Sequence, residues 1–211
     1  MSLHTHTISR LLHQSLTEMM KSQPLQSFRL GDGTALSLQL GHRMSNEIDL
    51  YTDAPFKESD FERIKTYITA TFGHGEHHQY EAKGTGTSFF VYNMNRDYVK
   101  VDLYYTNAFI RPEQQVESLR MAALEDIIAM KLEAIRKGGR KTDFWDLHEL
   151  LQTHTLPEMV ALHAERYPET HSKKELLAKL TYFDIADEEF DPGCLRKKDW
   201  DLMKLDLVDA V

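Results

Sequence analysis

Two acidic residues, Glu47 and Asp49, lie two positions apart in a segment, residues 47–52, that alternates polar and apolar side chains. This alternation predicts a half-buried strand, on which residues two apart point to the same face. The two carboxylates are therefore expected side by side, with Ile48 and Leu50 turned into the core. Adjacent carboxylates repel, and an ion pair or a shared hard cation relieves the repulsion. By itself the pattern also fits an ordinary exposed strand face.

A third carboxylate, Asp102, lies on a second predicted strand, residues 98–105, and shares a face of that strand with Lys100. If the two strands are neighbours in a sheet, Asp102 converges with Glu47 and Asp49. Three clustered carboxylates suit Mg²⁺, which keeps several waters and takes further ligands from substrate phosphates. The alternative is a solvated acidic residue on an edge strand.

A glycine-rich segment, Gly31-Asp32-Gly33-Thr34, joins a short predicted strand to a short predicted helix. Free backbone N–H groups at a helix N-terminus bind anions, and glycine permits a phosphate to approach closely. Thr34 is placed to cap the helix or to donate a hydrogen bond to a phosphate oxygen. Most such segments are only turns, so both interpretations remain open.

Lys131 lies in the apolar stripe of a predicted helix, residues 124–137, rather than on its polar face. A lysine in that position must extend to solvent, find a partner or face a cleft. Asp143 lies on the apolar side of the next predicted helix, residues 143–152, with Asp146 at its edge. One interpretation is a structural ion pair between the helices. The other is a lysine that reaches nucleotide phosphates and is positioned by Asp143.

Two further groups of residues have a composition that suits ligand binding. The histidines in residues 74–78 are metal-ligand types without a complete spacing signature, and they alone support a metal-dependent hydrolase. The basic residues between Lys131 and Lys141 could contact RNA, although solvated helix ends have the same composition.

Hydrophobic periodicity and turn residues predict the elements that must position these side chains. The first half of the chain mixes helices with strands, and after Pro112 the pattern becomes helical. We therefore expect an α+β domain over residues 1–110 and a mainly helical domain over residues 111–211. The predicted strands are 28–30, 47–52, 77–82, 88–93 and 98–105, and the predicted helices are 4–22, 34–40, 58–72, 124–137, 143–152, 157–167, 173–180 and 199–211.

Composition restricts the class of protein. The 211 residues include 25 Lys and Arg and 33 Asp and Glu, a formal net charge of −8, which argues against general coating of nucleic acid or anionic membrane. Cys194 is the single cysteine, which excludes an intrachain disulfide and a cysteine-based zinc site. The polar amino-terminal region and the lack of an apolar run of about 18 residues favour a cytoplasmic protein with no membrane contact.

The order of these signals resembles one known signature. Gly33 and Thr34, a GHR-x-S segment at residues 41–45, and then Glu47 and Asp49 are similar to the opening motif of the AbiEii/AbiGii toxin family. That family is part of the polymerase-β-like nucleotidyltransferase superfamily.

The helical half carries the rest of the resemblance. The segments around Lys131 and Asp143 resemble the lysine-bearing and aspartate-bearing helical motifs of the same family, and the likeness covers about residues 28–151. It implies a nucleotidyltransferase-like mixed β-sheet flanked by helices and followed by a C-terminal helical region.

The resemblance also implies a function, the transfer of a nucleotidyl group from an NTP to an acceptor hydroxyl with Mg²⁺ or Mn²⁺ as the cofactor. The acceptor would be tRNA, another RNA or a protein. The chain would be the toxin of a toxin–antitoxin or phage-defence pair, with a cognate antitoxin protein as its partner. By family role, Glu47, Asp49 and Asp102 are metal ligands and catalytic residues, with Asp102 a candidate base, and Gly33, Thr34, Lys131 and Asp143 hold the nucleotide.

Two residues differ from the family pattern. Asp32 stands where the family usually has a glycine, and a carboxylate beside a phosphate opposes binding unless it points away. Glu47 stands where the family usually has aspartate. These differences favour the alternative, a catalytically decayed protein that keeps the fold and binds a nucleotide or a partner protein without turnover.

Overall fold

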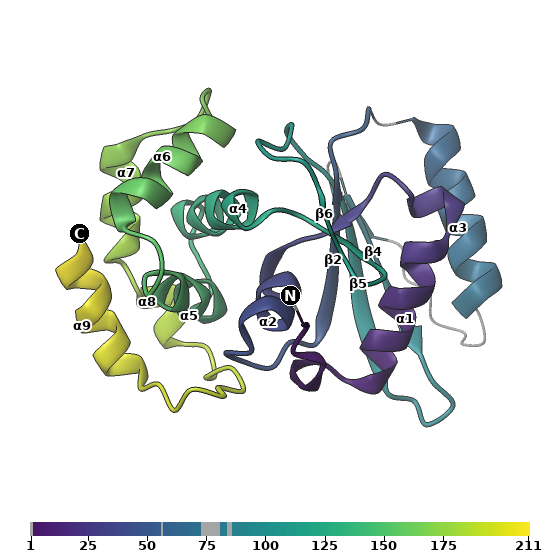
Figure 1. Ribbon diagram of the computed structural model, residues 1–211, viewed down its shortest axis with the longest axis horizontal. Coiled ribbons are helices and arrows are strands. Elements are labelled where there is room, and N and C mark those ends of the chain that lie inside the picture. Colours follow the sequence, from purple (N-terminus) through teal and green to yellow (C-terminus); the bar gives the residue numbers. More distant parts are fainter. Residues whose placement is uncertain (1, 56, 73–80, 84–85) are drawn as a thin grey trace.

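One β-sheet crosses the middle of the molecule (Figure 1). The computed structural model describes residues 2–55, 57–72, 81–83 and 86–211. Seven strands among these residues form the sheet, in the order β3-β4-β5-β2-β1-β7-β6. The strands are β1 (Arg29–Leu30), β2 (Glu47–Thr52), β3 (Glu81–Lys83), β4 (Gly86–Tyr92), β5 (Tyr98–Tyr105), β6 (Gln114–Val116) and β7 (Leu119–Met121).

The two central strands, β2 and β5, run parallel to each other, and their register sets Asp49 opposite Asp102. β4 pairs antiparallel with the other edge of β5, and β1 pairs antiparallel with β2. Alternation along β2 and β5 separates two faces, because successive side chains of a strand point to opposite sides. One face buries apolar side chains, namely Ile48, Leu50, Val99, Val101 and Leu103.

Helices cover both faces of the sheet. Figure 1 shows α1 (Arg10–Lys21) and α3 (Glu58–Phe72) on one side, and α2 (Asp32–Leu40) on the other. The Ser9 hydroxyl starts α1 by accepting a hydrogen bond of 3.1 Å from the Leu12 N–H. A short 3-10 helix, Thr5–Thr7, precedes α1.

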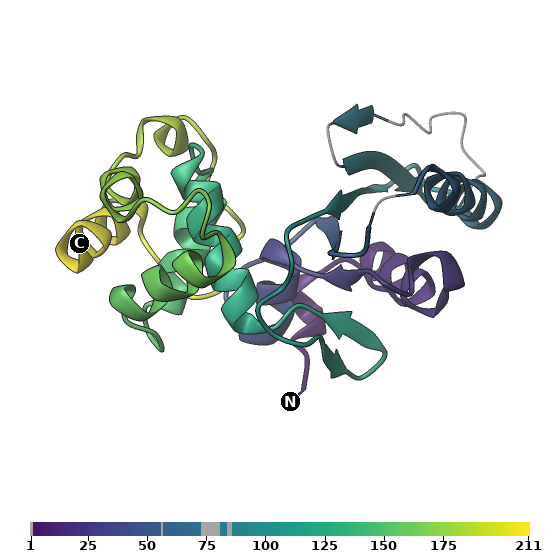
Figure 2. The same ribbon diagram turned by 90° about the horizontal axis from the view of Figure 1, so that it is seen from above.

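The second half of the chain is helical, and Figure 2 shows it beside the sheet half. Helix α4 packs against α5, α6 and α7, and both α4 and α5 contact α2, which joins the two halves. None of the described helices is long and apolar enough to cross a membrane. The helices of this half are α4 (Leu124–Arg136), α5 (Lys141–Leu150), α6 (Leu156–Arg166), α7 (Lys173–Leu180), α8 (Asp184–Asp187) and α9 (Trp200–Ala210).

The structure confirms the predicted α+β fold class, and β2 and β5 have the predicted bounds. Several helix starts differ from the prediction: α5 begins at Lys141 rather than at Asp143, α6 and α9 each differ by one residue, and the first two helices differ as follows. The first long helix begins at Arg10 rather than at residue 4, because Ser9 is extended and caps it. Helix α2 begins at Asp32 rather than at Thr34, so the second glycine of the predicted turn lies in the first turn of the helix.

A hairpin after Pro112 was not predicted. β6 and β7 have only three residues each, too few for periodicity to identify, and β7 pairs parallel with β1. These strands of the sheet lie beyond the predicted domain boundary at residue 110, which stays a prediction. Most of the predicted strand 77–82 falls outside the described residues, which resume with β3.

Candidate active site

Three carboxylates converge on the polar face of the central strands. Glu47 and Asp49 extend from β2 and Asp102 from β5, and one oxygen of each lies within 4.8 Å of the other two. Asp49 and Asp102 are buried, and Glu47 is partly exposed at the start of its strand. The structure therefore brings together the three predicted metal ligands, which we call the acidic triad. Among the described residues it is the one cluster of at least three metal-ligand side chains.

The three carboxylates of the triad differ in their surroundings: Asp49 is crowded by other acids, whereas Asp102 has hydrogen-bond donors. Burial raises the pKa of Asp49 well above its usual range, and the neighbouring Asp32, Glu47 and Asp102 raise it further. Asp102, by contrast, accepts hydrogen bonds from the Ser88 hydroxyl and from Lys100 Nζ, the latter at 2.7 Å. Carboxylates crowded in this way fit a divalent cation, whose charge offsets the repulsion and whose preferred ligands are oxygens.

Lys131 lies buried behind the triad and pairs with three carboxylates. Its Nζ is 2.8 Å from Asp143 Oδ1 and 2.9 Å from Asp146 Oδ2, and it also pairs with Asp32. Burial alone would lower the pKa of Lys131, but the three carboxylates outweigh burial and raise it. The other oxygen of Asp143 accepts a 2.9 Å hydrogen bond from the Arg140 N–H, which closes the N-terminus of α5. The predicted contact between Lys131 and Asp143 is confirmed, and both interpretations of it remain compatible with the geometry.

Asp146 connects this lysine to the segment before β2. Its carboxylate accepts hydrogen bonds of 2.7 Å from His42 Nε2 and of 2.6 and 2.8 Å from Arg43. Burial opposes ionisation of Asp146, but Arg43 and Lys131 hold its pKa well below the usual range. The sequence interpretation assigned no role to Arg43 and placed Asp146 only at a helix edge. The GHR-x-S segment was the available signal for both.

Gly33 and Thr34 connect α2 to Arg43 and to the start of β2. A β-carbon at residue 33 would lie 2.3 Å from a guanidinium nitrogen of Arg43, so a larger residue there would have to displace that group from its contact with Asp146. The Thr34 side chain is fully buried, and its hydroxyl contacts Ser45 Oγ at 2.7 Å and donates to the Glu47 carbonyl. Direct contact of these two residues with phosphate stays a prediction.

A cavity of about 210 Å³ opens beside the triad. Its lining includes Gly33, Glu47 and Asp49 of the predicted residues, together with Asp32 and Arg140. Arg140 reaches within 3.9 Å of Glu47 and is half exposed, so it brings a positive charge to the cavity. The other predicted residues do not line it, and Lys131 contacts its wall through Asp32. The histidines at residues 74–78 lie outside the described residues.

The fold is that of a nucleotidyltransferase. MenT4, a nucleotidyltransferase toxin from Mycobacterium tuberculosis H37Rv, superimposes with a TM-score of 0.62 at 15% sequence identity, covering 94% of this chain and 80% of that one. JHP933 from Helicobacter pylori superimposes with a TM-score of 0.53 at 18% identity, covering 96% of this chain and 91% of that one.

The chain belongs to the family described as nucleotidyl transferase AbiEii toxin, type IV TA system, whose model matches residues 14–211. This finding confirms the resemblance carried by the opening motif and the two helical motifs. An uncharacterized protein of Aquifex aeolicus (strain VF5) is 28% identical over 167 residues, which are 77% of this chain and 76% of that protein.

Proposed function

We propose that this protein transfers a nucleotidyl group from an NTP to an acceptor hydroxyl, with a divalent cation held by the acidic triad. The observation that carries the proposal is the convergence of Glu47, Asp49 and Asp102 within 4.8 Å beside a cavity that also receives Arg140. Carboxylates supply the ligands of a hard cation, and the arginine supplies donors for phosphate oxygens.

Mg²⁺, or Mn²⁺ in its place, would screen the triphosphate charge and favour ionisation of the attacking hydroxyl when bound there. Asp49 and Asp102 are suited to hold the cation because paired parallel strands fix their spacing. Glu47 can contribute a third oxygen, since its longer side chain starts from the same face of β2.

The nucleotide is expected to enter with its phosphates first. A cavity of about 210 Å³ is smaller than the roughly 300 Å³ or more of most small-molecule pockets, so it suits the phosphate end rather than a whole nucleotide. Arg140 lines it directly, and Lys131 would reach it if Asp32 moved aside. Asp143 holds Lys131 in position through its 2.8 Å contact.

In the transfer step, the acceptor oxygen forms a bond to the α-phosphorus of the NTP. The bond from that phosphorus to the oxygen bridging the β-phosphate breaks, and pyrophosphate leaves with the electron pair. The hydroxyl proton passes to a carboxylate, for which Asp102 is our candidate. Ser88 and Lys100 fix the orientation of that carboxylate.

The direct test is transfer of label from each α-³²P-NTP, with Mg²⁺, to total RNA and to protein of a cell extract. Asp49→Asn should abolish transfer, while Asp60→Asn, at an exposed side chain of α3, should leave transfer unchanged. Transfer by Asp49→Asn at the wild-type rate would remove the triad from the chemistry.

A second candidate function, nucleotide binding without turnover, is favoured by one observation. The Asp32 carboxylate forms an ion pair with Lys131 and lines the cavity, where its negative charge opposes the binding of a triphosphate. NTP binding by calorimetry with no labelled product, and with no dependence on Mg²⁺, would support this candidate over the transferase.

We further propose that the chain is the toxin of a type IV toxin–antitoxin pair, supported by the family to which it belongs. Growth arrest on expression, dependent on Asp49 and relieved by a protein encoded beside it, would test this role. Arrest that persists in Asp49→Asn would separate toxicity from nucleotidyl transfer.

A further inference from the structure

Aromatic side chains continue the polar face of the sheet beyond the acidic triad. Phe90 and Tyr98 meet edge to face with ring centres 5.6 Å apart, and Tyr92 lies 5.9 Å from Tyr98 and 6.4 Å from Phe90. Tyr98 is 63% exposed, which is unusual for a large ring on a strand. We call these three residues the aromatic patch.

Strand register places the patch and the triad on one face. Phe90 pairs with Lys100 and Tyr92 pairs with Tyr98, while two residues further along the same strands Ser88 pairs with Asp102. Since side chains two apart share a face, the rings and the carboxylates point to the same side. Tyr98 and Asp102 are four residues apart, or about 13 Å along a strand.

A cavity of about 770 Å³ adjoins the patch and reaches the triad. Phe90 and Tyr98 line it from the strands, Arg10 lines it from the start of α1, and Lys100 and Glu47 line the end nearest the triad. The cavity therefore joins the exposed Tyr98 ring and the half-buried Phe90 ring to the site where we place the transfer step.

The four charged side chains that line this cavity, Arg10, Lys100, Glu47 and Asp97, balance one another, whereas the whole chain has a net charge of −8. Arg10 is exposed and makes no ion pair within the part of the chain that the structure describes. Of the two carboxylates that line the cavity, Glu47 belongs to the triad, and Asp97 accepts a 2.8 Å hydrogen bond from the Asn93 amide in the turn between β4 and β5.

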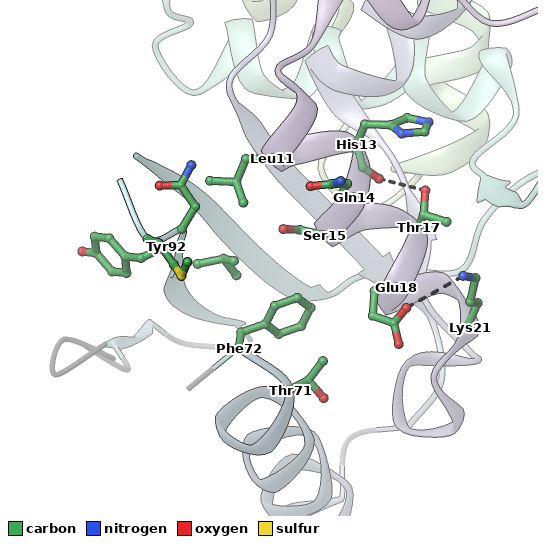
Figure 3. Close-up of a pocket in the computed structure, with 13 residues that line it drawn as sticks. Leu11, His13, Gln14, Ser15, Thr17, Glu18, Lys21, Thr71, Phe72 and Tyr92 are labelled. Carbon is green, nitrogen blue, oxygen red and sulfur yellow. Dashed lines mark hydrogen bonds and ion pairs between the residues drawn. The ribbon is translucent and has the colours of Figure 1, made fainter. Parts of the chain in front are cut away.

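A neighbouring pocket does not share these properties. Figure 3 shows the pocket between α1, the end of α3 and β4, where the Leu11 and Phe72 side chains line the wall and the Tyr92 ring points away. Its charged pair, Glu18 and Lys21, is joined within one helix at 3.8 Å. The exposed Tyr98 ring and the Arg10 guanidinium instead line the cavity that Glu47 of the triad also lines.

We propose that the aromatic patch binds unpaired bases of a single-stranded polynucleotide whose terminal hydroxyl reaches the acidic triad. Exposed rings stack on the faces of bases, and nearby cations contact the phosphates, which are the two features of single-strand binding surfaces. A separation of about 13 Å corresponds to roughly four nucleotides stacked 3.4 Å apart. The proposal rests on the proposed function, because it assigns the acceptor of that reaction.

The test is fluorescence anisotropy of the full chain with labelled eight-nucleotide RNA, DNA of the same sequence, and the blunt duplex of each. We expect tighter binding of the single strands than of the duplexes, because base pairing hides the stacking faces. Tyr98→Ala should weaken single-strand binding about tenfold, within the range measured for one stacked base. Tyr98→Phe should keep wild-type affinity, and Tyr182→Ala, at a half-exposed tyrosine of the helical half, is the matched control.

Equal affinity of wild type and Tyr98→Ala for single strands would overturn the proposal, as would preferential binding of duplex. Label transfer only to protein, at a rate insensitive to Tyr98→Ala, would overturn it in favour of a protein acceptor. The RNA and DNA arms distinguish the two sources of the strand.

A failure of the proposed function would give a different result from a failure of the aromatic-patch proposal. Asp49→Asn should lose transfer but keep a single-strand affinity that Tyr98→Ala weakens, since Asp49 lies outside the patch. Single-strand binding that depends on Tyr98, together with no transfer by the wild type, would leave the patch assigned and refute the transferase.

Discussion

Asp32 holds Lys131 in an ion pair from a backbone conformation that favours glycine, with a φ of 54°. Asparagine and aspartate tolerate this left-handed region better than most residues, yet it still costs about 1 kcal/mol. The Asp32 carboxylate offsets the charge of Lys131 and lines the cavity in which we propose that the phosphates bind.

Replacement of Asp32 by glycine should therefore strengthen nucleotide binding. Asp32→Gly frees Lys131 from one of its three carboxylates, removes a negative charge from the cavity wall and relieves the left-handed backbone. We expect the Kd for an NTP to fall about tenfold, or about 1.4 kcal/mol, in calorimetric titrations. Glu117→Gly is the matched control, because Glu117 is an exposed acid with the same φ of 54°. An unchanged or higher Kd in Asp32→Gly would show that Asp32 does not oppose the phosphates.

Metal binding should stabilise the protein through Asp49. A cation that binds only the folded state raises the free energy of unfolding by about 2.7 kcal/mol at a concentration 100 times its Kd. At a pH above the raised pKa of Asp49, Asp49→Asn removes a repelled, buried charge, so the metal-free variant should be more stable there than metal-free wild type. The variant should also lose the response to Mg²⁺ and Mn²⁺. Thermal unfolding with and without chelator measures both effects. A metal-dependent rise in the Tm of Asp49→Asn equal to that of wild type would contradict the assignment.

Metal affinity should rise with pH. The folded-state pKa of Asp49 is raised, so between the ordinary value of 3.8 and that raised pKa the metal-free protein holds a proton that the cation must displace. The same proton stabilises the metal-free folded state in this window, so the free energy of unfolding of the metal-free protein changes in the opposite direction and falls as pH rises through the folded pKa. At pH values below the raised pKa, the apparent Kd for Mn²⁺ should fall up to tenfold for each unit by which the pH rises. A Kd independent of pH from 5 to 8 would argue that Asp49 is not protonated in the metal-free protein.

The Asp146 carboxylate should be a main determinant of stability. It is fully buried and is shared by His42, Arg43 and Lys131, so Asp146→Asn leaves buried cations without their counter-charge. Loss of one partner of a buried ion pair typically costs about 3–5 kcal/mol. The matched control is Asp206→Asn, whose 2.9 Å contact with His148 is largely exposed and should contribute about 1 kcal/mol or less. Urea unfolding measures the free energy of unfolding of both variants. Similar losses of stability in the two would contradict the expectation that the buried network contributes more than the exposed pair.

The Thr34 hydroxyl should matter for the position of Glu47. Thr34→Val keeps the shape of the side chain but leaves the buried Ser45 hydroxyl and the Glu47 carbonyl without this partner, at a cost of about 1–3 kcal/mol. Thr34→Ser restores the hydroxyl and should restore stability and Mn²⁺ affinity together. If Thr34→Val weakens NTP binding while stability and metal affinity are unchanged, the hydroxyl acts on the phosphates instead.

The sequence by itself determined the local elements and which side chains share a face. The alternation along residues 47–52 and 98–105 predicted β2 and β5 with the bounds that the structure has, and it set Glu47 and Asp49 on one face. The position of Lys131 within an apolar stripe left three possibilities, extension to solvent, a partner or a cleft, and the structure shows a buried lysine with three carboxylate partners. These predictions succeed because the periods of strands and helices follow from backbone geometry, which acts between residues close in the chain.

Only the tertiary structure decided which elements meet. The parallel pairing that sets Asp49 opposite Asp102 joins residues 53 positions apart, and the contact of Arg43 with Asp146 spans 103 positions. Such pairings depend on how all the helices and strands pack together, because the entropy of closing a long loop is repaid only by burial across the whole core. The left-handed conformation of Asp32 and the exposure of Tyr98 beside the triad arise in the same way. Chain periodicity places the carboxylates and the lysine on particular faces of their strands and helix. Packing brings Glu47, Asp49 and Asp102 together beside one cavity, with Lys131 paired to Asp32 of the cavity wall.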